Sequence, residues 1–600
     1  MKSQFTPLLL GLMLFVCNGS AAGSTKWIEV ESPHFRVVTD GSQTDARHVA
    51  FGLEQLRYIF ATEFPKLRLD SGAPLLVFAA TDQNTAQSLL PSLKKAKGGE
   101  YVAGIYFHGW EKQYAMLRLD HPEIATVYHE YVHSILHINM RWLPRWLDEG
   151  IAEYYTYTRF ENHKIYVGAP SIRSPMLRNY PLIPIEKLFS PDSKWQGPMQ
   201  EQLFYAESWA LVHYMTFGPG MEGGARLSRF FVLIQNGESQ EAAFQQVFGD
   251  FKEMDRALEK YVEHYAFSAG VYDTPPSIDE KTFLARILPP ADADAQLAAF
   301  HIWTHDVEGA LPLAQQAVNA DPKLGIAHED MGYVLFTQGK DAAAENEFTQ
   351  AYSLDGTLYL SLFAKTMLSP SAGSSSPSDQ TDFESALQKV VILNPQFAPA
   401  FVELARLAIR QNDLEKALRL SQRAQQLEPG RAEYHLLTGQ ILQRMGRGAD
   451  AAALAKFVAD RWKGPDHDEA VELWNLIPAK DRPVGTLALD ASATELKTAD
   501  GVLKSVTCSE KSKEYALAVD DNGKVLTFHA NSGFATGFSD TLWYGEDHFT
   551  ICHHLDGMRA VVRFRASSAK GYDGDIAELE VRDSFPGPAL GDVTPSPAGR

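Results

Sequence analysis

Two histidines that flank a glutamate are the residues of this chain best suited to chemistry. They stand in the run His129-Glu130-Tyr131-Val132-His133. Side chains at i and i+4 leave a helix on the same face, so both imidazoles can bind one zinc ion. Glu130 would then point toward the open coordination position and act as the base that takes a proton from water. A motif this short also occurs by chance, as two surface histidines beside a solvated glutamate, so its meaning depends on the residues downstream of it.

A second acidic segment comes after a proline-containing turn. It reads Leu143-Pro144-Arg145-Trp146-Leu147-Asp148-Glu149-Gly150-Ile151-Ala152-Glu153-Tyr154-Tyr155 and is expected to be helical. Glu149 can supply a third, anionic ligand and leave the fourth position free, as a catalytic zinc site requires. Glu153, one turn later, can accept a hydrogen bond from the far nitrogen of a ligand histidine. Asp148 is expected to serve the start of the helix.

These residues resemble the gluzincin metallopeptidases, most closely the peptidase MA-like branch, which pairs His-Glu-x-x-His with a downstream Trp-Leu-x-Glu-Gly-x-Ala-Glu. The resemblance extends over about residues 27–267. It implies one zinc ion per chain held by His129, His133 and Glu149, with Glu130 as the general base. Glu153 matches an acid that supports a ligand histidine in thermolysin-like enzymes. One departure is that only fifteen residues separate His133 from Glu149, a few fewer than in thermolysin.

The aminopeptidase N family offers two further comparisons. Its pattern Tyr-x-Lys-Gly-Ala-x-x-Leu is partly matched by Tyr205-Ala206-Glu207-Ser208-Trp209-Ala210-Leu211, with Glu207 in place of the lysine. Tyr205 is therefore expected either to stabilise a tetrahedral oxyanion or to pack in the core. The Gly-x-Met-Glu-Asn motif of that family has no counterpart in Val102-Ala103-Gly104-Ile105-Tyr106-Phe107. The glutamate of that motif would hold the free amino terminus of a substrate. Because it has no counterpart here, the enzyme is expected to be an endopeptidase, which cleaves inside a chain.

The elements that must position these residues are predicted to form an α+β, zincin-like domain over residues 23–270. Strand patterns occur at 35–39, 75–79 and 114–119, a helical pattern at 46–60, and mostly helical sequence at 121–270. The strand at 114–119 is expected to be an edge strand along the cleft, where an extended substrate could pair with it. His137 and His213 are expected to be structural or hydrogen-bonded histidines, as is His121.

Residues 290–465 carry an internal repeat. The pairs Asp321-Pro322, Asp355-Gly356, Asn394-Pro395 and Glu428-Pro429 close successive units, spaced by 34, 39 and 34 residues. Small residues recur at matching places within the units, which resembles the tetratricopeptide repeat and predicts an α-helical solenoid. A Ser/Pro-rich insert at 369–382 is expected to be a surface loop or linker. Residues 483–590 alternate in the manner of strands and predict a small β-rich C-terminal domain.

Length and composition set outer limits on function. A chain of 600 residues suggests three to five domains, and the net charge of -20 disfavours a nucleic-acid partner. Residues 1–22 have the pattern of a secretory signal peptide, in preference to a membrane anchor or a lipoprotein signal at Cys17. The mature protein is therefore expected to be secreted or periplasmic, without membrane insertion. Cys508 and Cys552 could pair there or remain two buried thiols.

Three functional hypotheses arise from these patterns. The first is a secreted zinc metallopeptidase that hydrolyses a peptide or protein substrate, with a protein partner bound by the repeats. The alternative is a repeat scaffold whose zincin domain is catalytically silent. An intact Glu130 favours the first, since a silent domain needs no base. A zinc-dependent hydrolase or transferase acting on other substrates is also compatible with the motif, because a fold does not determine a substrate.

Overall fold

The computed structural model describes most of the chain between residues 26 and 581. The described ranges are 26–70, 75–91, 104–108, 112–120, 126–190, 198–264, 266–275, 277–304, 306–372, 376–463, 465–483, 497–508, 515–521, 523–530, 535–538, 555, 557–565 and 571–581. The predicted signal peptide, His121 and the pairing of Cys508 with Cys552 lie outside the described residues or side chains. No helix within these ranges combines the length and apolarity needed to cross a membrane.

A six-stranded mixed sheet organises the N-terminal unit, in the order β4-β5-β3-β2-β1-β9. Its strands are β1 (Ile28–Glu31), β2 (Arg36–Thr39), β3 (Leu75–Ala80), β4 (Gly104–His108), β5 (Gln113–Arg118) and β9 (Leu284–Ile287). The central pairs β2–β3 and β3–β5 are parallel, and the outer pairs are antiparallel. Because β9 pairs with β1, this unit continues past the expected boundary at residue 270.

The expected edge strand is an interior one. The strand predicted at 114–119 corresponds to β5, which is hydrogen-bonded on one side to β3 and on the other to β4. The prediction was wrong because alternation identifies a strand but not its neighbours, and β4 was not recognised as a strand. Within the described residues the edge of the sheet on this side is β4, which also packs against the helix that carries the histidines.

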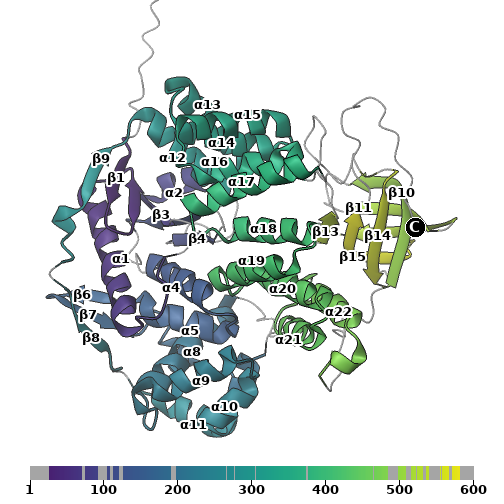
Figure 1. The fold of residues 1–600 in the computed structure, drawn as a ribbon. Coiled ribbons are helices and arrows are strands. Elements are labelled where there is room, and N and C mark those ends of the chain that lie inside the picture. Colours follow the sequence, from purple (N-terminus) through teal and green to yellow (C-terminus); the bar gives the residue numbers. More distant parts are fainter. Residues whose placement is uncertain are drawn as a thin grey trace, which may run out of the picture.

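Side chains alternate between the two faces of the sheet, and each face has its own helical cover (Figure 1). The face toward α1 (Gln43–Glu63) and α4 (Thr126–Asn139) belongs to the main core. The opposite face packs against α2 (Gln83–Leu89) and α12 (Pro290–Trp303), where the ring centroids of Phe78 and Phe300 lie 4.7 Å apart. The first helix of the solenoid is therefore part of the core of the N-terminal unit.

The helical half of the N-terminal unit packs below the sheet in Figure 1. Its longest members are α5 (Arg145–Thr156), α8 (Pro198–Phe217), α9 (Ala225–Gln235), α10 (Gln240–Phe248) and α11 (Phe251–Val262), with the short helices α6 (Met176–Asn179) and α7 (Ile185–Leu188). A small antiparallel sheet joins β6 (Arg159–Glu161), β7 (Lys164–Val167) and β8 (Gly270–Asp273). The most extensive helix contact of this half is between α5 and α8.

Paired helices form the solenoid from residue 290 onward. After α12 come α13 (Val307–Ala320), α14 (Gly325–Thr337), α15 (Asp341–Leu354), α16 (Tyr359–Leu368), α17 (Pro377–Leu393), α18 (Ala398–Arg410), α19 (Leu414–Leu427), α20 (Ala432–Arg444), α21 (Gly448–Ala459) and α22 (Pro465–Leu476). Consecutive helices pack on one another along the series, which is the tetratricopeptide arrangement. The predicted small residues are all buried at these contacts: Ala298, Ala310, Ala317, Gly332, Ala344, Ala351, Ala405, Ala417, Ala424, Gly439 and Ala451.

Glycine is required at one of these positions. A Cβ at Gly332 would stand 2.6 Å from the ring of Phe348, so a side chain there would separate α14 from α15.

The insert expected as a loop is partly helical, since α17 begins at Pro377 and a short 3-10 turn covers Pro370–Ala372. Proline in the first turn of a helix is compatible with the helix, which a reading of composition alone overlooks.

The C-terminal strands form a second six-stranded sheet, in the order β12-β11-β10-β14-β15-β13. They are β10 (Lys497–Cys508), β11 (Tyr515–Asp521), β12 (Lys524–Ala530), β13 (Ala535–Phe538), β14 (Arg559–Arg565) and β15 (Gly574–Val581). Its own apolar cluster includes Leu503, Val519, Phe528 and Leu579. The molecule is thus mixed α and β, mainly helical, with a β-rich C-terminal part.

Candidate metal centre

Helix α4 carries both histidines on a face that remains accessible while its other face is buried. Val127, Tyr131 and Ile135 belong to the main core, as their spacing predicts. The side chains of His129 and His133 are each 12% exposed. The helix therefore holds the two imidazoles from its buried side and leaves each of them slightly exposed.

A glycine lets the helix that carries Glu149 approach its support closely. Helix α5 starts directly after Pro144, and Gly150 faces the backbone of α8. A Cβ at Gly150 would lie 2.5 Å from the carbonyl oxygen of Ser208, which no side chain can tolerate without separating the helices. Gly150 thus allows α5 to pack closely on α8, and this packing fixes the position of the neighbouring Glu149.

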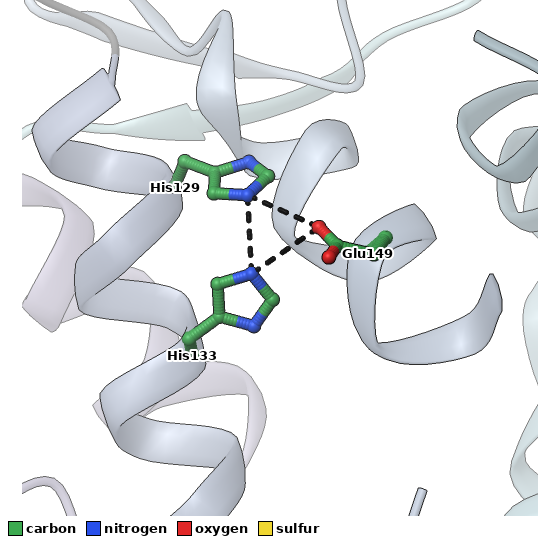
Figure 2. Close-up of side chains that lie close together, drawn as sticks. All are labelled: His129, His133 and Glu149. Carbon is green, nitrogen blue, oxygen red and sulfur yellow. Dashed lines mark hydrogen bonds and ion pairs between the residues drawn. The ribbon is translucent and has the colours of Figure 1, made fainter. Parts of the chain in front are cut away.

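Three donor atoms from α4 and α5 converge on one point (Figure 2). The Nε2 atoms of His129 and His133 lie 3.1 Å apart, and Oε2 of Glu149 lies 3.3 and 3.5 Å from them, respectively. Donors around a tetrahedral zinc ion, bonded at about 2.1 Å, are separated by about 3.4 Å. The short connection between the two helices is therefore compatible with the separations that a zinc ion requires.

Hydrogen bonds to the far nitrogens orient both imidazoles. Nδ1 of His129 lies 3.0 Å from Oγ1 of Thr156, whose hydroxyl donates to the carbonyl of Ala152, so Nδ1 is the donor in this pair. Nδ1 of His133 lies 2.9 Å from Oδ1 of Asp148 and donates to it. These hydrogen bonds turn Nε2 of each ring toward the other donors, where a metal ion that replaces the proton would find a lone pair.

The charges at this point favour a cation. Oε2 of Glu149 is buried and accepts no hydrogen bond. Burial raises the pKa of Glu149, but the facing histidines outweigh it and lower this pKa to about 2, so the carboxylate is ionised. Burial lowers the pKa of His133, but Asp148 and Glu149 outweigh it and raise this pKa to about 10. A buried carboxylate oxygen facing the Nε2 atoms of two histidines is a set of atoms that fits a divalent metal ion, which would replace the proton that these groups otherwise hold.

Glu130 and Tyr205 lie in the electrostatic field of the same cluster. Burial raises the pKa of Glu130, and the positive charge of the histidines opposes that rise. Burial and then the charge of Glu149 raise the pKa of Tyr205 on α8 to about 12, so its hydroxyl keeps its proton at neutral pH. The charges of the cluster thus act on both residues.

The residue expected to support a ligand histidine only approaches it. Oε1 of Glu153 is 3.8 Å from Nδ1 of His129 and makes its ion pair with Arg173, at 3.0 Å. Thr156 makes the hydrogen bond that Glu153 was predicted to make. Thr156 lies seven residues after Glu149, on the same face of α5, and this spacing could have identified it.

Asp148 was expected only to serve the start of α5, but its side chain also contacts two histidines of α4. Its two carboxylate oxygens accept hydrogen bonds from His133 and, at 3.0 Å, from Nε2 of His137. His137 is therefore hydrogen-bonded as expected, and together with His133 and Asp148 it forms a second group of donor atoms at the rim of the site. His213 is buried between the hydroxyl of Tyr261 and the carbonyl of Ser268, away from this cluster, in a structural role.

Comparisons with known proteins match parts of the chain. Residues 123–219, which contain the convergent donors together with Glu130 and Tyr205, match a family model described as a protein of unknown function, DUF1570. No curated protein matches the chain. Among solved structures, PilF of Pseudomonas aeruginosa is 16% identical and covers 32% of this chain and 86% of its own, with a TM-score of 0.28.

Two further solved structures are similar to this chain and cover nearly the same fraction of it. A tetratricopeptide repeat protein of Thermus thermophilus is 15% identical and covers 31% of this chain and 98% of its own, with a TM-score of 0.26. PilW, a type IV pilus biogenesis factor, is 19% identical and covers 30% of this chain and 96% of its own, with a TM-score of 0.24.

Proposed function

We propose that the N-terminal unit is a zinc-dependent peptidase domain of the gluzincin type, held beside a tetratricopeptide scaffold. The proposal is carried by one observation: the convergence of two oriented Nε2 atoms and an ionised Glu149 oxygen within 3.1–3.5 Å of one another. His129, His133 and Glu149 would hold the ion. A site of two histidines and one carboxylate leaves a coordination position open, which is typical of catalytic zinc.

Zinc in such a site supplies Lewis-acid polarisation of a carbonyl and lowers the pKa of water. The chain itself would supply the proton transfers. Glu130 would accept a proton from the attacking water and pass it to the leaving amine, so that one residue serves as base and then as acid. Its raised pKa suits this task, because a more basic carboxylate is a better proton acceptor near neutral pH.

Tyr205 would act on the oxygen of the carbonyl under attack. Because its pKa is raised to about 12, the phenol remains a hydrogen-bond donor throughout the physiological range. A donor directed at the developing oxyanion stabilises the transition state more than the ground state. Glu207, which replaces the lysine of the related pattern, is fully buried and accepts a hydrogen bond from the backbone of Ile183, so it supports the fold around Tyr205.

An extended peptide would bind along β4. This strand ends the sheet among the described residues, so one row of its backbone groups can pair with another strand. Its contact with α4 would bring such a peptide past the cluster of donors. Cleavage within a chain is then the expected reaction, in a secreted or periplasmic protein.

The substitution Glu130→Gln tests the peptidase function. The variant should lose hydrolysis of a peptide library while retaining its zinc, because Glu130 is proposed as a base and not as a ligand. Glu186→Gln, an exposed carboxylate on α7, is the matched control and should keep full activity. Full activity of the Glu130 variant, or loss of its metal, would contradict the assignment.

A scaffold with a silent zincin domain is the second candidate, favoured by an apolar pocket in the solenoid. The pocket encloses about 480 Å³ between α14, α15, α16, α18 and α20, and its walls include Phe336, Phe348, Phe363, Met367, Val402 and Leu437. Such a pocket can hold apolar side chains of a protein partner. Under this function, Met367→Glu should abolish peptide binding by the full chain, whereas Ile392→Glu, at an exposed site outside the pocket, should not.

A further inference from the structure

A polar cavity of about 540 Å³ lies where the N-terminal unit meets the solenoid. One wall comes from the end of α1 and the segment after it, and the other from α19 and the loop before α18. Three guanidinium groups line it, with one carboxylate and two amides: Arg57, Arg68, Arg423, Asp70, Gln396 and Gln426. Its volume is that of a site for a small molecule.

The positive charges of this cavity exceed the negative charges on its walls. Arg57 pairs with Asp70 at 2.8 Å through Nη2, and the hydroxyl of Tyr131 also lies beside its guanidinium group, so this arginine is already neutralised. Arg68 donates to neutral backbone carbonyls, of Leu427 and, at 2.8 Å, of Ile138, and only the nearby charge of Glu428 offsets part of its own. Arg423 is exposed, and no ion pair of it occurs within the described part of the chain.

Arg68 and Arg423 line the same cavity from opposite walls, and their charges repel each other. Burial and then the nearby charge of Arg423 lower the pKa of Arg68. Glu428, the other acid near Arg68, is engaged by Arg431 at 3.1 Å. The chain as a whole has a net charge of -20, so the excess of arginines at this cavity is a local feature and does not reflect the overall composition.

We propose that this cavity is a binding site for a phosphate group carried by a small molecule. A guanidinium group matches the oxygens of phosphate with paired donors, and a dianion balances more of the excess charge than a monoanionic carboxylate does. Gln396 and Gln426 add amide donors beside the arginines. The site is independent of the proposed peptidase chemistry, since none of its lining residues belongs to the metal cluster.

The bound group would touch both structural units. Arg68 contacts the end of α4, through the carbonyl of Ile138 and through Asn139, whose side chain accepts from the backbone N–H of Arg68 at 2.8 Å. Arg423 and Gln426 belong to α19 of the solenoid. A phosphate held between Arg68 and Arg423 would therefore join the helix that carries the histidines to the repeats.

Calorimetric titration of the full-length, zinc-loaded protein with inorganic phosphate tests the site. Arg423→Ala and Gln426→Glu should each weaken binding about tenfold or more, since the first removes a positive charge from the cavity and the second adds a negative one. Arg419→Ala removes an equal charge from an exposed position of the same helix, outside the cavity, and should change the affinity less than about twofold. All three side chains are exposed, so melting temperatures should remain those of the parent.

Three results would overturn the proposal. The first is the absence of saturable phosphate binding by the parent. The second is binding that survives in both cavity variants, as it would if phosphate bound only to the metal. The third is equal binding of acetate at the same ionic strength, which would show a site without preference for phosphate.

Discussion

Replacing Asp148 by asparagine would change one charge behind the proposed ligand His133. Asparagine has nearly the same shape, and its amide oxygen can still accept the hydrogen bond from Nδ1, which now spans 2.9 Å. Burial raises the pKa of Asp148, but hydrogen bonds from His133 and His137 outweigh it and lower this pKa well below its usual range. The parent bond is therefore charge-assisted at any working pH, and the variant bond would be neutral.

The size of the effect can be worked out from that difference. A hydrogen bond to a charged group contributes about 1.5–3 kcal/mol, and a neutral one about 1 kcal/mol. The loss of about 0.5–2 kcal/mol corresponds to about 2- to 30-fold weaker zinc binding. The pKa of His133, raised to about 10, should fall with the loss of the Asp148 charge, so protons would compete less with zinc. We therefore expect the lower part of the range, about 2- to 10-fold, at neutral pH.

Competition with a fluorescent zinc chelator at fixed pH measures this affinity. A matched control is available in the solenoid, where Nδ1 of His301 bonds to Asp306 at 2.8 Å in a similar pair far from the metal cluster. Asp306→Asn also removes one charge, and asparagine retains the ability to cap α13, so zinc affinity should be unchanged. Equal zinc affinity of the Asp148 variant and the parent, or an equal loss in the Asp306 variant, would refute the role given to Asp148.

Three further outcomes are expected. Tyr205→Phe should lower the turnover number about a hundredfold with unchanged zinc content and melting temperature, whereas a packing role would leave turnover near that of the parent. Lys112→Met should destabilise the protein by about 3–5 kcal/mol in urea unfolding, because it leaves buried Glu329, now 2.8 Å from the ammonium group, without its partner; adding Glu329→Gln should restore part of the loss. Burial lowers the pKa of His213 to about 4, below its ordinary value of 6.5, so the unfolded chain binds more protons between these pH values. Stability should fall as the pH drops from 6.5 to 4, and His213→Phe should reduce that slope.

The sequence predicts individual elements better than their neighbours. Sequence patterns located β2, β3 and β5 to within one residue at each end, because each pattern is local. The edge position of β4 was not predictable in this way, since it depends on which strands pair across the sheet. The entry of Leu284–Ile287 into the same sheet likewise depends on contacts between distant parts of the chain.

The candidate metal cluster shows the same limit. Helical spacing predicts that His129 and His133 share a face, and the structure brings Glu149 to them from the next helix. The imidazoles are oriented by donating to Thr156 and Asp148. Spacing along α5 places Thr156 on the face of Glu149, but which histidine each acceptor meets depends on the crossing of α4 and α5. The cavity lined by Arg57, Arg68 and Arg423 was invisible in the sequence, because its two walls stand hundreds of positions apart.

Metal analysis of the purified full-length protein tests the central claim most directly. After equilibration with zinc and removal of free metal, the parent should contain one zinc ion per chain. The double variant His129→Ala/His133→Ala should contain almost none while keeping the helical circular-dichroism spectrum of the parent. A parent without zinc, or a double variant with the full zinc content of the parent, would contradict the assignment of these residues as a metal centre.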